Sequence, residues 1–106
     1  MTEATVEVEM AGEQTLRIAL CGEVDLANVS TVEADLLAAI SNQLADVVLD
    51  VSEMTYIDSA GLRALFALGA RLDTLQIGFH LIVPPGSTVR RVVELSGLTA
   101  LASLEP

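Results

Sequence analysis

The sequence predicts an α/β domain with a mostly parallel sheet, an N-terminal β-hairpin and about three helices. Two short runs of alternating apolar and polar residues surround a turn near the start of the chain, which is typical of a hairpin. After them, apolar runs of strand length alternate with segments whose apolar residues recur every three or four positions. Such alternation favours right-handed crossovers and parallel strands. The length of 106 residues indicates one domain, which we expect to span residues 1–106.

The predicted hairpin joins two half-buried strands, each with one face exposed to solvent. Apolar residues alternate with polar ones over Val6–Met10 and again over Leu16–Leu20, around a turn at 11–14. Cys21 continues the second strand, and we expect it to be a small core residue rather than a reactive thiol. Because it is the only cysteine, the sequence predicts no disulfide framework.

A first helix follows the hairpin. Its apolar residues recur at helical spacing over Val29–Leu44. Ser30 and Glu33 have the spacing of a capping box, but Asp25 and Asn28 are alternative caps. The pattern therefore leaves the start of this helix open by about a turn.

The centre of the chain is a buried strand, a bend and a second helix. The apolar run Val47–Val51 predicts the strand, and the polar residues 50–55 predict the bend. The helix is expected from about Ser59 to Leu72, with Leu62, Leu65, Phe66, Gly69 and Leu72 on one stripe. Residues 77–83 then have the pattern of another strand.

A third helix and a short last strand complete the predicted order, β-β-α-β-α-β-α-β. Ser87 is the expected cap of that helix, and Ser96-Gly97 is its expected end. Residues 101–104 are long enough for one short strand.

Composition narrows the classes of partner. The chain carries 15 acidic and 5 basic residues, all Arg, for a formal charge of −10, which argues against nucleic acid and anionic membrane surfaces. Aromatic residues make up only 3%, and without Trp little is left for stacking on bases. No basic leader and no apolar run of about 20 residues is present, so we expect a cytoplasmic protein without membrane insertion.

Two corners of the chain should meet at one edge of the sheet. Parallel neighbouring strands have their carboxyl ends at the same edge, which places the corner at Gly22–Asp25 beside Asp58 and Ser59. Open α/β sheets usually bind their partners along such an edge.

The acidic residues of this edge allow a metal site or only helix caps. Glu23, Asp25, Asp50 and Asp58 are the carboxylates that could hold Mg²⁺. A receiver-like phosphoaspartate pocket would also use a Lys, and the chain has none. Because Asp so often caps helices or ends strands, the sequence favours no metal and no cofactor.

Catalysis by this edge is weakly supported. A nucleophilic Ser59 needs a positioned base, and the only histidine, His80, falls inside an apolar strand pattern. The sequence has no glycine-rich phosphate loop and no Gly-x-Ser-x-Gly. We therefore expect no catalytic residues. Ser59 is left with two compatible interpretations, a helix cap or an acceptor of phosphate at a helix start.

The motifs of the chain resemble those of the anti-sigma factor antagonists, whose fold is the STAS domain. The resemblance covers almost the whole chain, about Val6 to Leu104. The matching segments are Gly22-Glu-Val-Asp25, Asp50-Val-Ser52, Ile57-Asp-Ser-Ala-Gly-Leu62 and Ser96-Gly97-Leu98. The Asp-Ser-x-Gly-Leu element is fairly specific when it follows a buried strand and Asp-x-Ser.

The resemblance implies a phosphorylated binding switch. In the family, the serine of Asp-Ser-x-Gly-Leu, here Ser59, is phosphorylated by an anti-sigma factor that is also a serine kinase. The unphosphorylated antagonist binds that kinase and frees the sigma factor, and a serine phosphatase resets it. An alternative is a structural STAS subunit of a lipid-transport ABC system or of another cytoplasmic assembly.

The expected partner surface combines both corners with the outer side of the second helix. That side has few long side chains and is either an interface or merely solvated. The residues assigned to the surface are Glu23, Asp25, Asp58, Ser59, Gly61, Arg63 and Ala67.

Overall fold

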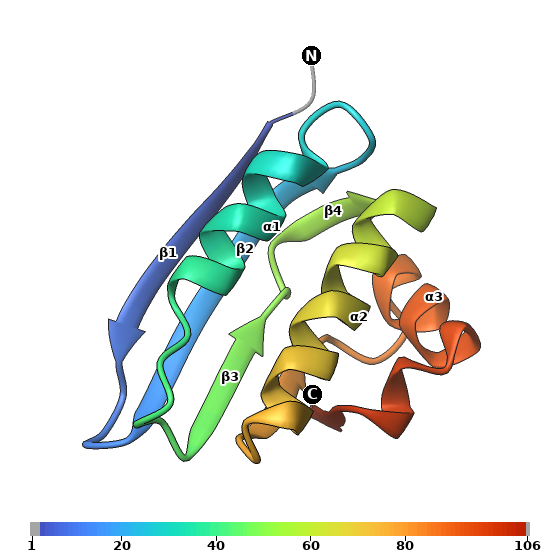
Figure 1. Cartoon of the computed structure of the whole chain (residues 1–106). Coiled ribbons are helices and arrows are strands. Elements are labelled where there is room, and N and C mark those ends of the chain that lie inside the picture. The colour runs from blue at the N-terminus through green and yellow to red at the C-terminus, as the bar shows by residue number, and fades with distance from the viewer. Residues whose placement is uncertain (1–2, 106) are drawn as a thin grey trace.

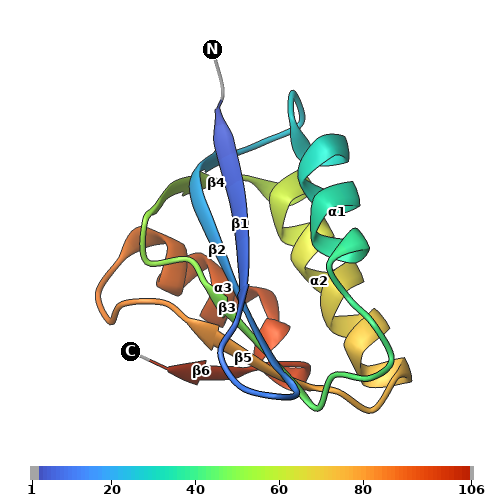
Figure 2. The ribbon, with the colours of Figure 1, turned by 90° about the vertical axis from the view of Figure 1, so that its left-hand side faces the viewer.

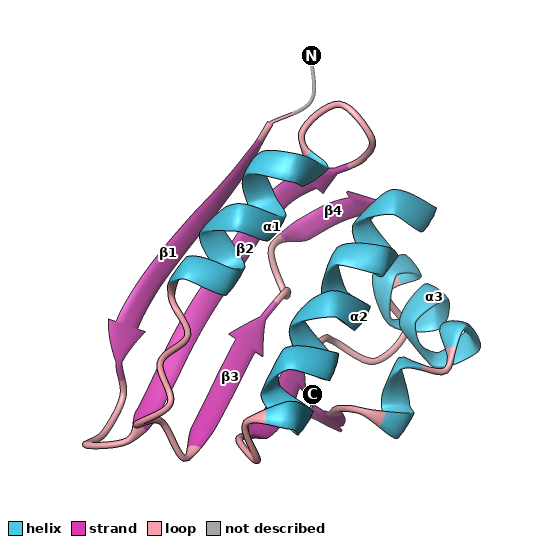
Figure 3. Ribbon diagram, viewed as in Figure 1, coloured by secondary structure: helices cyan, strands magenta, loops and turns pink. Residues whose placement is uncertain are grey.

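The computed structural model describes residues 3–105 and confirms the predicted α/β class (Figures 1 and 3). The ends of the predicted domain, residues 1–2 and 106, lie outside the described residues. Six strands form one sheet in the order β1-β2-β3-β5-β6, and β4 pairs with β2. The elements are β1 (Ala4–Met10), β2 (Thr15–Val24), α1 (Val29–Ala38), β3 (Asp46–Asp50), β4 (Met54–Ile57), α2 (Ser59–Thr74), β5 (Gly78–Ile82), α3 (Thr88–Ser96), the 3₁₀ helix η1 (Leu98–Ala100) and β6 (Ser103–Glu105).

Strand directions follow the prediction. β1 and β2 form the antiparallel hairpin, and every other pairing in the sheet is parallel. β2 and β3 are neighbours, with Ile18 opposite Leu49. Their carboxyl ends therefore lie at the same edge of the sheet, as predicted.

The core lies between the sheet and the helices. Figure 2 shows α1 and α2 on the same side of the sheet. Strand residues that face this side, such as Leu16, Ile18 and Leu20, are buried, whereas their sequence neighbours on the other face are partly exposed. Cys21 belongs to that second face and is only partly buried, so its predicted place in the core is wrong.

The fourth strand was not predicted from the sequence. β4 begins inside the expected bend at 50–55 and pairs with the end of β2 beyond an irregularity at Gly22 and Glu23. Its two central residues, Thr55 and Tyr56, are both exposed, so the strand lacks the alternation by which strands are recognised.

Helix α1 is shorter than its apolar pattern indicated. It ends at Ala38, whereas Ile40 and Leu44 pack on the core from the following loop. Asn28 is its N-cap residue, so the alternative start at Asn28 holds and the capping box at Ser30 does not. Apolar spacing extended the prediction because loop residues can pack on a core as helical ones do.

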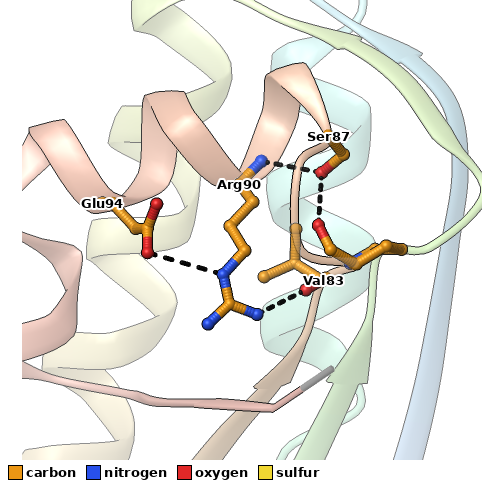
Figure 4. Close-up of polar contacts among 5 residues, drawn as sticks. Val83, Ser87, Arg90 and Glu94 are labelled. Atoms are coloured by element: carbon orange, nitrogen blue, oxygen red, sulfur yellow. Dashed lines mark hydrogen bonds and ion pairs between the residues drawn. The ribbon is translucent and has the colours of Figure 1, made fainter.

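The end of the chain follows the prediction with one addition. The Ser87 hydroxyl accepts a hydrogen bond from the Arg90 amide at 3.1 Å and donates one to the carbonyl of Pro84 at 2.8 Å, which caps α3 (Figure 4). Gly97 ends α3 in the left-handed region, at φ 87°. The 3₁₀ helix η1 and its C-cap at Leu101 precede the last strand, so β6 begins at Ser103, two residues later than expected.

Candidate functional site

The candidate site lies where β2 and β4 end side by side. Val24 is opposite Ile57 in the parallel pairing, and the Asp58 amide donates to the Val24 carbonyl at 3.3 Å. The chain after β2 becomes a loop at residues 25–28, and the chain after β4 becomes α2. The two predicted corners are therefore in contact.

The Asp58 carboxylate caps α2 and tethers the neighbouring loop. Its Oδ1 accepts from the Gly61 amide at 3.0 Å, and its Oδ2 accepts from the Leu26 amide at 3.3 Å. Asp58 has extended backbone geometry, as an N-cap residue does. The cap of α2 is therefore Asp58, and the interpretation of Ser59 as the cap is wrong.

Ser59 is the first residue of α2 and is exposed. Within residues 3–105, its hydroxyl makes no hydrogen bond. The hydroxyl also stands at the positive end of the helix dipole, where an anion is stabilised. Ser59 is thus accessible to an enzyme that modifies hydroxyls, and such a modification removes no structural contact.

The loop at residues 25–28 is braced by its own side chains. The Asp25 carboxylate accepts from the Ala27 amide at 2.8 Å, and the Asn28 side chain accepts from the Asp25 amide at 3.1 Å. The same Asn28 side chain donates to the carbonyl of Glu23 at 2.8 Å. A loop held in this way presents a fixed shape beside Ser59.

Gly61 is buried beneath the corner. A Cβ at this position would lie 2.6 Å from Cγ1 of Ile57 and 3.1 Å from the carbonyl oxygen of Val24. Helix α2 therefore approaches β2 and β4 this closely only with glycine there. Gly61 supports the corner through packing and offers a partner no exposed surface.

The outer side of α2 carries the other predicted surface residues. Arg63, Ala70 and Arg71 are exposed, and Ala67 is partly buried. Glu23 is exposed near the end of β2, and Asp25 and Asp58 are partly buried. Asp58 thus adjoins Ser59 in sequence, whereas Arg63 and Ala67 lie four and eight residues further along α2.

Asp50 stands apart from the other acidic residues. Its carboxylate forms an ion pair with Arg17 on β2 and accepts from the Ser52 amide at 2.9 Å. Burial raises the pKa of Asp50, but the hydrogen bonds from Ser52 and the Arg17 charge outweigh it and hold that pKa below its ordinary value. Over residues 3–105, no three metal-binding side chains are grouped as a metal site would need.

His80 pairs with two carboxylates on the partly exposed face of the sheet. Its Nε2 lies 2.9 Å from Oδ1 of Asp46 on β3, and its Nδ1 lies 3.1 Å from Oε2 of Glu105 on β6. The hydrogen bond with Asp46 raises the pKa of His80, and the charge of Glu105 adds to the effect. His80 thus lies in β5, as its place in an apolar strand pattern indicated, and its side chain is half-exposed.

Sequence reasoning missed Leu26 and Tyr56. Leu26 is 79% exposed in the braced loop, and Tyr56 is 50% exposed two residues before Asp58. An apolar residue between Asp25 and Asn28, inside a turn, was the available signal for Leu26. No periodic pattern marked Tyr56, because its strand was not recognised.

The fold and the corner define a small α/β protein that presents a hydroxyl at a capped helix start. Residues 7–106 match the STAS domain family. A Bordetella bronchiseptica protein that carries the name of an anti-sigma factor antagonist, BtrV, is 35% identical over 82 residues, or 77% of this chain and 70% of that protein. The chain belongs to the STAS domain family, as the motifs indicated.

Two solved structures share the fold. The crystal structure of an anti-sigma factor antagonist from Mycobacterium paratuberculosis has a TM-score of 0.84 and 26% identity, and covers 98% of this chain and 86% of its own. The structure of the Bacillus cell fate determinant SpoIIAA in its phosphorylated form has a TM-score of 0.71 and 23% identity. The match covers 96% of this chain and 92% of SpoIIAA. No helix within residues 3–105 is both long and apolar enough to span a membrane.

Proposed function

We propose that the chain, as one STAS domain over residues 1–106, is an anti-sigma factor antagonist switched by phosphorylation of Ser59. The unphosphorylated protein binds an anti-sigma factor that is also a serine kinase, and the sigma factor is released. That kinase transfers the γ-phosphoryl group of ATP to the Ser59 oxygen and releases ADP, and a serine phosphatase restores the hydroxyl. The protein acts in the cytoplasm as a substrate and binding partner, not as an enzyme.

The observation that carries this proposal is the division of roles between Asp58 and Ser59. Asp58 caps α2, so the exposed Ser59 hydroxyl serves no structural purpose within residues 3–105. The names of the BtrV protein and the mycobacterial structure support the role of antagonist. The phosphorylated form of SpoIIAA belongs to another protein with this fold, and so supports only the capacity of the fold to carry a phosphate.

A phosphate on Ser59 should switch binding without refolding the protein. It adds roughly −1.5 to −2 charges, which the helix N-terminus favours by about 0.3–1 kcal/mol. The carboxylates of Asp58 and Asp25 oppose it, since a like charge at about 4 Å costs about 1 kcal/mol in water. Docking, by contrast, must remove water from a near-dianion, and about 3 kcal/mol of unrecovered desolvation weakens binding roughly a hundredfold.

The test measures modification and binding together. The protein is incubated with each anti-sigma kinase encoded in its genome and Mg-ATP, and mass spectrometry locates the phosphate. We expect modification at Ser59, none in Ser59→Ala, and unchanged modification in Ser52→Ala, which alters another exposed serine near this edge. Phosphate at Ser52 or Thr55 in the Ser59→Ala protein contradicts the assignment.

Binding is then compared between variants by calorimetry. Ser59→Ala should bind the kinase as tightly as the unmodified protein, and Ser59→Asp should bind poorly with an unchanged circular dichroism spectrum. Equal affinities of Ser59→Asp and wild type would overturn the switch.

A further inference from the structure

We propose that Arg63 is the internal partner of a phosphate on Ser59, so that phosphorylation also withdraws the Arg63 side chain from the outer face of α2. This inference rests on the proposed modification of Ser59 and adds a second charge change to the same surface. It makes Arg63 a positioning residue for the phosphate.

The positions of the two residues in α2 make the contact possible. Ser59 is the first residue of the helix and Arg63 is four residues further, so their side chains are neighbours on the helix surface. Both are exposed, and both lie away from the buried stripe that includes Gly61, Ala64 and Leu65. An anion on the N-terminal member and a cation four residues later is the favourable order for such a pair.

Arg63 has no competing acidic partner on its own helix. The positions three and four residues away hold Ser59, Ala60, Phe66 and Ala67, none of which is charged. Within residues 3–105, Arg63 makes no ion pair or side-chain hydrogen bond. A phosphate on Ser59 is therefore the anion that helix geometry would bring to it.

Asp58, the nearest carboxylate in sequence, is already occupied. Its two oxygens accept from the amides of Gly61 and Leu26, which face the helix start and the braced loop. The arginine is thus available to the phosphate, while the carboxylate remains in its structural role.

Three of the four other arginines are either paired elsewhere or too far along α2 to replace Arg63. The chain has no lysine, Arg17 is paired with Asp50, and Arg90 contacts Glu94 at 3.5 Å and the Val83 carbonyl at 2.9 Å (Figure 4). The Arg90–Glu94 contact shows that this chain forms ion pairs at the same spacing of four residues. Arg71 is on α2, but it lies twelve residues from Ser59, or about 18 Å along the helix.

The test uses protein in which phosphoserine is encoded directly at position 59, so that no kinase is needed. The second pKa of the phosphate is measured by ³¹P NMR titration in the wild-type background and in Arg63→Gln. Because Arg63 stabilises the dianion, we expect this pKa to be higher in Arg63→Gln by about 0.2–0.4 of a pH unit.

Two further variants separate the pair from a general change in charge. Arg71→Gln removes the same charge from the same helix and should leave the phosphate pKa unchanged. Arg63→Lys keeps the positive charge, so its phosphate pKa should lie close to that of the wild-type background. In 1 M salt the difference in phosphate pKa between the wild-type background and Arg63→Gln should disappear. An identical phosphate pKa in the wild-type background and Arg63→Gln, or an equal change in Arg71→Gln, overturns the proposal.

The outcome is independent of the test of the proposed function. If no kinase modifies Ser59 but Arg63 lowers the pKa of the encoded phosphate, the proposed function is contradicted and the contact between the phosphate and Arg63 is supported. If a kinase modifies Ser59 and Arg63→Gln leaves the phosphate pKa unchanged, the proposed function is supported and the contact between the phosphate and Arg63 is contradicted.

Discussion

Asp58 and Leu26 are joined across the two corners of the site by a hydrogen bond of 3.3 Å from the Leu26 amide to Oδ2 of the carboxylate. The other oxygen, Oδ1, accepts from the Gly61 amide. One carboxylate therefore sets both the start of α2 and the place of the loop at residues 25–28. Ser59, next to Asp58 in sequence, is relieved of any capping role.

Replacing Asp58 should lower stability, whereas replacing its neighbour should not. Asp58→Ala removes the cap of α2 and the bond to Leu26, which together should lower the free energy of unfolding by about 1–2 kcal/mol. Ser59→Ala should change it by less than about 0.5 kcal/mol. Urea denaturation of both variants checks the contrast, and an equal loss in the two would mean that Ser59 shares the cap.

Gly61→Ala should destabilise the protein although alanine is the better helix former. The propensity of alanine favours the variant by about 1 kcal/mol, but overpacking of this kind typically costs 1–3 kcal/mol. The added methyl would lie 2.6 Å from Ile57 and 3.1 Å from the Val24 backbone, which must move apart. We expect a net loss in thermal stability.

Gly12→Ala, in the turn between β1 and β2, is a control for adding a methyl group where there is room for it. A Cβ on Gly12 would meet only Thr15 atoms at 3.8 Å, which is ordinary contact. Its melting temperature should stay within a few degrees of the wild type. A Gly61→Ala protein as stable as the Gly12→Ala protein would show that α2 can shift away from β2 and β4 at no cost.

The ion pairs of His80 should make part of the stability depend on pH. Its pKa is raised above the ordinary value of about 6.5 in the folded state, chiefly by the hydrogen bond with Asp46. The resulting stabilisation is fully present below the unfolded pKa and is lost as pH rises through the folded pKa. The ring is 33% exposed, so solvent weakens the effect.

His80→Gln isolates this contribution from the repulsion among the other charges. The stability difference between wild type and His80→Gln should be larger at pH 6 than at pH 8.5, as measured by urea denaturation. The ¹H NMR titration of the His80 ring should have its midpoint above 6.5. A midpoint at or below 6.5 would mean that Asp46 and Glu105 do not hold the ring in solution.

The sequence predicted the sheet and the two corners because both depend on patterns that follow the chain. The apolar runs at Val47–Val51 and 77–83 and the motif at Asp58 indicated that β2 and β3 are parallel neighbours and that Ser59 lies at a helix start. β4 was missed because Thr55 and Tyr56 are both exposed and its pairing with β2 is a contact between distant residues.

The contacts that complete the site could not be predicted from periodic patterns in the sequence. Which of two adjacent residues, Asp58 or Ser59, caps α2 depends on where the backbone leaves the extended region, and sequence spacing leaves that open by one residue. The bond from Leu26 to Asp58 and the burial of Gly61 arise only when β2 and β4 lie side by side.

The outer face of α2 should be part of the partner interface. Arg63→Glu places an acidic side chain one turn from Ser59 on an exposed position, so it should not change thermal stability. If the anti-sigma factor docks over Ser59, the reversed charge should weaken binding at least tenfold, or about 1.4 kcal/mol, in calorimetry. Arg91→Glu, which makes the same change at an exposed position of α3, should bind as wild type does. If Arg63→Glu also binds as wild type does, the outer face of α2 at Arg63 is not part of the interface.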